Sequence, residues 1–175
     1  MPAILRATIV VLSLALLPAA LVACTSSGKL SLEDYFAEVE KLDTAQTEKQ
    51  DEIDGEYEDK LNPTEFTDQV TEDFVAYFEA SRGAAQDFVD ELKDLDPPAE
   101  AADAHDEAVE AFDDCLEETG KIVEDIGDAS SFEELGAVFE DQSVTDACDR
   151  TTATCEALQG IADENDIEVD LDCGE

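Results

Sequence analysis

The side chains that most often perform acid–base chemistry or bind metals are scarce in this chain of 175 residues, which has one histidine and five cysteines. His105 stands close to Asp103 and Asp106, and a histidine beside a carboxylate could act as a general base or a metal ligand. The apolar residues at helical intervals around it favour a different role, a histidine on the inward face of a helix that is hydrogen-bonded at the end of a bundle. A di-iron bundle would need two Glu-x-x-His motifs, but position 102 is an alanine.

No other pattern marks a reactive group. The sequence contains no G-x-S-x-G, no H-E-x-x-H and no glycine-rich phosphate loop. Its 48 acidic residues recur at helical spacing throughout, so no pair of carboxylates stands out as that of a glycosidase. We therefore assign no catalytic, cofactor-binding or metal-binding residue and predict a protein that is not an enzyme. An enzyme that uses scattered carboxylates is the alternative.

Four of the cysteines, Cys115, Cys148, Cys155 and Cys173, can pair in three ways. Cys148 and Cys155 are expected on one helix, where the 1.5 Å rise separates their Cα atoms by about 10 Å, too far for a disulfide. We favour Cys115–Cys148 with Cys155–Cys173, because the C-terminal tail then turns back only a short way along the last helix. The pairing of Cys115 with Cys155 and of Cys148 with Cys173 stays open. A zinc site would prefer close pairs such as C-x-x-C, and the sequence has none.

The fifth cysteine follows an apolar segment at the N-terminus. Residues 1–6 carry one positive charge, and residues 7–23 are apolar but too few for a comfortable membrane span. The segment ends in Leu21-Val22-Ala23-Cys24, with an aliphatic residue three positions before the cysteine and a small one directly before it. This ending resembles the lipobox of bacterial lipoproteins.

The resemblance implies a lipoprotein signal peptide over residues 1–23, cleavage before Cys24 and a lipid-anchored tether over residues 24–30. Cys24 would carry a diacylglyceryl thioether, and its new amino group would be acylated, for example by palmitate. Two or three acyl chains anchor a protein stably where one does not. The alternative is an ordinary secretory signal that happens to end near a cysteine. Either form of export favours disulfides over free thiols.

The charge of the chain excludes several partners. Nine basic residues against 48 acidic ones give a formal net charge of −39. The clustered Lys and Arg that bind phosphate are missing, which argues against nucleic acid and against electrostatic attraction to anionic lipid head groups. The acidic surface is most simply a solvated face whose self-repulsion salt or divalent cations would screen. A surface that binds divalent cations with low affinity would have the same composition and remains the alternative.

Helical periodicity dominates from Ser31 to about Ile161. Ser31 with Asp34 is typical of a helix start, and apolar residues recur as far as Leu42 and again from Ile53. The weakly apolar stretch between them predicts that this helix frays or bends. Pro63 is expected at the first position of the second helix, with Leu61 packed on Phe66.

The second apolar stripe extends from Phe66 to Leu95, and Asp96-Pro97-Pro98 ends it and opens a third helix. The inward face of that helix would comprise Ala101, His105, Ala108, Phe112, Cys115, Ile122 and Ile126. A short helix is predicted from Phe132 to Phe139, and a last one from Ser143. Beyond Asn165 the apolar residues alternate, which indicates an extended tail lying on the bundle.

These elements predict an all-α fold: an antiparallel bundle of about four to five helices over residues 31–175, with a disulfide-stapled C-terminal tail. The expected function is that of a lipid-anchored module on the extracytoplasmic face of a cell membrane, which binds a protein partner or ligand without catalysis. The resemblance to helical bacterial lipoproteins supplies no site residue beyond Cys24.

Overall fold

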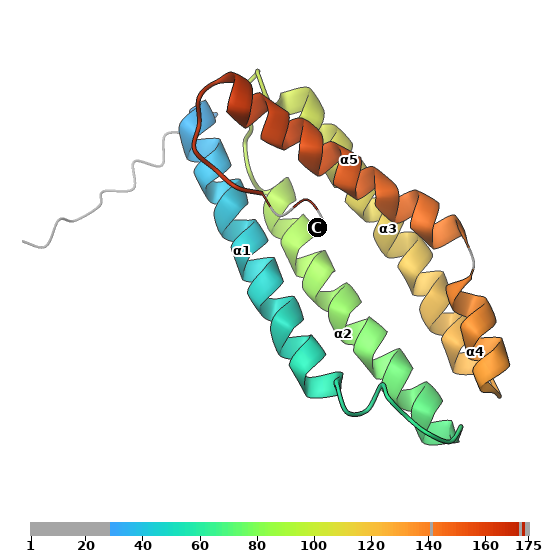
Figure 1. The fold of residues 1–175 in the computed structure, drawn as a ribbon. Helices are drawn as coiled ribbons and strands as arrows, with labels where there is room; N and C mark the ends of the chain where they lie inside the picture. The colour runs from blue at the N-terminus through green and yellow to red at the C-terminus, as the bar shows by residue number, and fades with distance from the viewer. Residues whose placement is uncertain (1–28, 141, 172, 174–175) are drawn as a thin grey trace, which may run out of the picture.

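The computed structural model describes residues 29–140, 142–171 and 173, and it confirms the all-helical antiparallel bundle (Figure 1). The helices are α1 (Leu32–Tyr57), α2 (Asp68–Lys93), α3 (Ala102–Asp128), α4 (Phe132–Phe139) and α5 (Gln142–Glu164). No strand occurs in the described part of the chain. None of the helices there combines the length and apolarity that crossing a bilayer requires.

One side of the bundle has little direct packing between helices in the described structure. Helix α2 packs between α1 and α3, and α5 packs against the other side of α3. Helices α1 and α5 therefore form the two edges of a curved layer, and the C-terminal tail descends between them (Figure 1).

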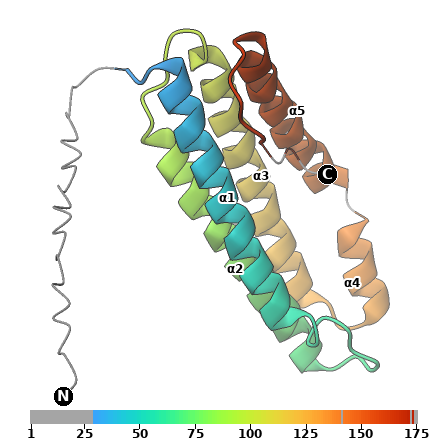
Figure 2. The ribbon, with the colours of Figure 1, turned by 60° about the vertical axis from the view of Figure 1, so that its left-hand side comes forward.

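Two apolar cores lie at opposite ends of the bundle. The larger core, near the start of α1 and the end of α5, contains Tyr35, Phe36, Val39, Leu42, Leu92, Ala101, Ala108, Leu158, Ala162 and Leu171. The smaller core consists of Val70, Ile122, Ile126 and Leu135, with several phenylalanines packed against it. Helix α4 covers this second core at the end of the bundle remote from the start of α1 (Figure 2).

Two serines start helices as their spacing predicts. The hydroxyl of Ser31 accepts a hydrogen bond of 3.1 Å from the backbone N–H of Asp34, and that of Ser131 accepts one of 3.2 Å from Glu134. Each serine satisfies one of the backbone donors that a helix N-terminus leaves unpaired. The predicted short helix over Phe132–Phe139 is confirmed at both ends.

The second helix begins later than predicted, at Asp68 instead of Pro63. Thr67 is fully extended, with φ −145° and ψ 163°, so the chain from Asn62 to Thr67 stays outside the helix. The cause is tertiary packing, because Phe66 lies edge-to-face on Phe132 with ring centroids 5.3 Å apart. An early helix start would compete with this contact.

Helix α1 also corrects a prediction, because it continues without interruption through the stretch expected to fray or bend. Few apolar residues occur between Leu42 and Ile53, because the side chains of this stretch that face α2 make polar contacts. Gln50 donates hydrogen bonds to Asp54 in its own helix and to Ser81 of α2, at 2.7 and 3.1 Å. Polar contacts thus hold this part of α1 to α2.

Both favoured disulfides are present in the structure. Cys115–Cys148 joins α3 to α5 with Cα atoms 4.8 Å apart, and Cys155–Cys173 joins α5 to the tail with Cα atoms 5.4 Å apart. The open alternative of Cys115 with Cys155 is therefore not the pairing found. The predicted inward face of α3 is largely confirmed: Ala101, His105, Ala108, Ile122 and Ile126 are buried, whereas Phe112 and Cys115 are half-buried.

Candidate binding groove

The C-terminal tail bridges the two edges of the helical layer. The backbone N–H of Leu171 donates to Oε1 of Gln159 in α5 at 3.0 Å, and Nε2 of Gln159 donates to the carbonyl of Val169 at 3.2 Å. On the other side, the N–H of Asp170 donates to Oε1 of Glu40 in α1 at 3.3 Å. The side chain of Leu171 is buried in the larger core.

Beside the tail, a groove of about 380 Å³ remains between α1 and α5. Its floor is apolar and comes from all four long helices: Val39, Ala85, Phe88, Leu92, Phe112 and Leu158. The rings of Phe88 and Phe112 pack edge-to-face, with centroids 5.2 Å apart. Both are half-buried, so the groove gives solvent access to two aromatic side chains within the bundle.

The rim of the groove is polar. Helical spacing puts five side chains of α1 on one face, and two from α5 stand opposite them: Asp43, Gln46, Thr47, Gln50 and Asp51, with Thr151 and Thr152. Two of these are carboxylates, and in the part of the chain that the structure describes no Lys, Arg or His lines the groove. The end wall is formed by Leu171 and by the disulfide between Cys155 and Cys173.

A hydrogen-bond network surrounds Gln50 on the α1 side of this rim. Besides its bonds to Asp54 and Ser81, Gln50 lies 3.4 Å from the hydroxyl of Tyr77, which itself donates to Oδ1 of Asp54 at 3.0 Å. Partial burial and the bond to Asp54 raise the pKa of Tyr77, so its hydroxyl stays protonated as a donor. Gln50 of the rim is therefore held in position by side chains of α2 and by Asp54 of its own helix.

The histidine does not belong to the groove. His105 is 4% exposed, and its Nδ1 lies 3.1 Å from the hydroxyl of Tyr35, which is itself fully buried. Burial lowers the pKa of His105, against the opposing effect of the nearby Asp106 charge. This is the buried, hydrogen-bonded histidine that the sequence favoured. Its sequence neighbours Asp103 and Asp106 are both exposed.

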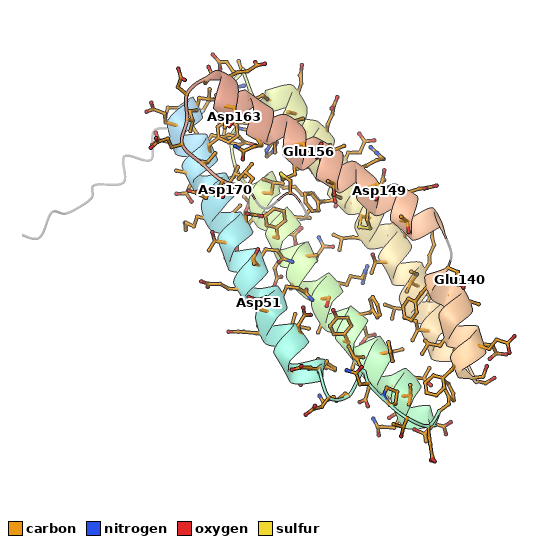
Figure 3. The ribbon with its side chains drawn as sticks, in the orientation of Figure 1. Asp51, Glu140, Asp149, Glu156, Asp163 and Asp170 are labelled. Carbon is orange, nitrogen blue, oxygen red and sulfur yellow. A yellow bond between two sulfur atoms is a disulfide. The ribbon has the colours of Figure 1, made fainter. Side chains whose placement is uncertain are left out.

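The acidic residues are distributed over the molecule. Side chains such as Asp51, Asp149, Asp163 and Asp170 project from α1, α5 and the tail at separate places (Figure 3). Within the described residues, no group of three or more His, Cys, Asp or Glu side chains is arranged to hold a metal ion.

The groove is the feature that sequence reasoning missed, and Cys24 is the predicted site that the structure leaves open. Cys24 lies outside the described residues. The one signal for the groove in the sequence is the weakly apolar stretch of α1, from which fraying or a bend is predicted. That this stretch forms the rim of a groove depends on α5 and the tail, which lie about 100 residues or more away in the chain.

The fold and the groove define the molecule as a disulfide-linked helical bundle with an apolar cleft. No protein-family model, no curated protein and no solved structure matches the chain.

Proposed function

We propose that this protein is a lipid-anchored binding module of the extracytoplasmic face of a bacterial membrane, and that it performs no catalysis. Acyl chains on Cys24 would hold it to the membrane, and the groove between α1 and α5 would be its ligand site. The single observation that carries the binding role is this groove of about 380 Å³ with an aromatic floor and a polar rim. Ligand sites are typically apolar clefts of about 300–1,000 Å³ with a few polar groups that orient the ligand.

The nature of the lining residues supports binding over catalysis. The groove contains no histidine, and its two cysteines are joined to each other, so neither supplies a nucleophile. The rim consists of amides, hydroxyls and carboxylates, which can orient a bound molecule by hydrogen bonds and charge.

The export and anchoring part of the proposal is tested by Cys24→Ser in a bacterial host grown with an alkyne fatty acid. We expect the variant to lose acyl labelling, to retain an uncleaved or differently processed N-terminus and to leave the detergent phase on partitioning. Thr25→Ala is the matched control, which changes the adjacent residue and should keep labelling and processing unchanged.

Mass spectrometry of the N-terminus decides the outcome. If the Cys24→Ser protein and its parent have identical N-termini and partition equally into detergent, the anchor proposal is wrong.

A further inference from the structure

We propose that the groove selects a small cationic amphiphile, an organic ammonium ion that carries one aromatic or branched aliphatic group. This inference rests on the proposed binding function and specifies its ligand class. Its starting point is the division of the groove into a floor that contains no charge and a rim that contains charge of one sign only.

The floor selects the apolar part of the ligand. Phe88 and Phe112 form its centre, and Leu158 extends it toward α5. An aromatic or branched aliphatic group placed here would bury its surface against ordered side chains. The volume of about 380 Å³ limits the ligand to a small molecule.

The rim selects the charge. Asp43 and Asp51 are both on the α1 side, two helical turns apart, and among the described residues no basic side chain lines the groove. The rest of the molecule reinforces them, since a net charge of −39 gives a negative potential around every opening in the surface. An anionic ligand of the same shape would be repelled, whereas an ammonium ion is attracted from a distance and held at the rim.

Three probes that share a phenylalkyl group and differ in the charge of the terminal group distinguish selection by the floor from selection by the rim. They are 4-phenylbutylammonium, 4-phenylbutanol and 4-phenylbutyrate. They are titrated at 150 mM NaCl into the full disulfide-bonded domain, and backbone amide shifts in two-dimensional NMR report both affinity and location. We expect the ammonium probe to shift amides around Gln46, Phe88 and Thr152. The alcohol should bind about tenfold more weakly at the same place, and the carboxylate should not bind measurably.

Charge-neutralising variants test the rim. Asp51→Asn should weaken the ammonium probe about two- to fivefold, a range typical of exposed charge pairs, and leave the alcohol unchanged. Asp149→Asn is the matched control, because it removes an exposed carboxylate of α5 that does not line the groove. Thr47→Phe, at an exposed rim position, should block both probes without disturbing the core.

The failures are distinguishable. Equal binding of alcohol and ammonium, unaffected by Asp51→Asn, would overturn the charge selection while leaving the groove a ligand site. Shifts spread over the whole acidic surface and indifferent to Thr47→Phe would mean diffuse cation accumulation and overturn the inference. No groove shift with any of the three probes would count against both this inference and the groove as the binding site.

Discussion

The contact between Tyr35 and His105 makes a polar pair part of the larger core. Tyr35 is fully buried, and burial raises the pKa of its phenol, so the hydroxyl carries its proton throughout the physiological range. His105 is buried in its neutral form, and the 3.1 Å hydrogen bond satisfies Nδ1. No buried polar side-chain atom in the described residues lacks a hydrogen-bond partner. Burial of this pair therefore carries no energetic penalty from an unsatisfied donor or acceptor.

The lowered pKa of His105 predicts a pH dependence of stability. Below an unfolded pKa of about 6.5, the unfolded chain binds a proton that the folded state does not, so unfolding becomes easier as the pH falls. One proton sets an upper limit of about 1.4 kcal/mol per pH unit on this slope, and the loss of stability levels off below the folded pKa. Urea unfolding of the parent and of His105→Gln at pH 7.0 to 5.0 measures this slope.

Because carboxylates also titrate as the pH falls, the informative quantity is the difference between parent and variant. His105→Gln should lower the free energy of unfolding at pH 7 and should flatten its dependence on pH. Parallel profiles for the two proteins would mean that the histidine is not the responsible group.

At the scale of elements, the C-terminal tail depends on its disulfide. Ile167, Val169 and Leu171 pack against the larger core, yet ordering a backbone costs about 1–2 kcal/mol per residue. The Cys155–Cys173 bond spans 18 residues, and a loop of that size contributes roughly 3 kcal/mol by constraining the unfolded chain. The disulfide therefore makes the docked tail more stable than the undocked one.

We therefore predict that Cys155→Ser/Cys173→Ser releases the tail while α1, α2 and α3 stay folded. Hydrogen exchange at residues 165–171 should become fast, whereas the helical circular dichroism should fall only slightly at 25 °C. The control is Cys115→Ser/Cys148→Ser, which removes the other disulfide and should leave the tail protected. A tail that stays protected without its own bond would show that side-chain burial alone suffices.

The sequence predicted the helices better than their arrangement. Ser31 and Ser131 carry local capping signals, so their helix starts could be identified from a few neighbouring residues. The start of α2 could not, because Phe66 is held out of the helix by Phe132, a contact across 66 positions. The groove was beyond prediction for the same reason, since its rim joins polar residues of α1 to threonines of α5.

For one part of the disulfide pairing, the spacing of the cysteines in the sequence is sufficient for a prediction. Excluding a bond between Cys148 and Cys155 required only the rise of a helix. Choosing between the two remaining pairings required the assumption that the tail reverses directly after α5. The turn at Asn165 and Asp166, where Asp166 has a φ of 56°, performs this reversal.

At the scale of the whole molecule, electrostatic self-repulsion opposes folding. Most of the basic side chains in the described residues form ion pairs, among them Lys93 with Asp113 at 2.8 Å and Arg150 with both Glu110 and Asp114 of α3. These pairs tie α2 and α5 to α3 but leave a large excess of carboxylates along every helix.

The melting temperature should therefore rise with salt, because molar NaCl shortens the screening length to about 3 Å. Each kcal/mol of relieved repulsion corresponds to about 2–4 °C for a chain of this size. Scanning calorimetry from 20 mM to 1 M NaCl measures the rise, and CaCl₂ should act more strongly per mole. A stabilisation by calcium beyond that of NaCl at equal ionic strength would favour the alternative of divalent-cation binding. A melting temperature that does not change would contradict both screening and cation binding.

The separation of α4 from the start of α1 determines how far from the membrane α4 can lie. Helix α1 has 26 residues and is therefore about 39 Å long, and α4 lies at its far end. If acyl chains on Cys24 fix the N-terminal end, like-charge repulsion from anionic head groups favours a bundle that stands away from the bilayer. Phe132 and Phe139 of α4, each almost half exposed, would then meet the surroundings some 40 Å above the lipid surface, several screening lengths beyond the membrane's own field. The helical bundle would then hold α4 away from the membrane in addition to forming the groove.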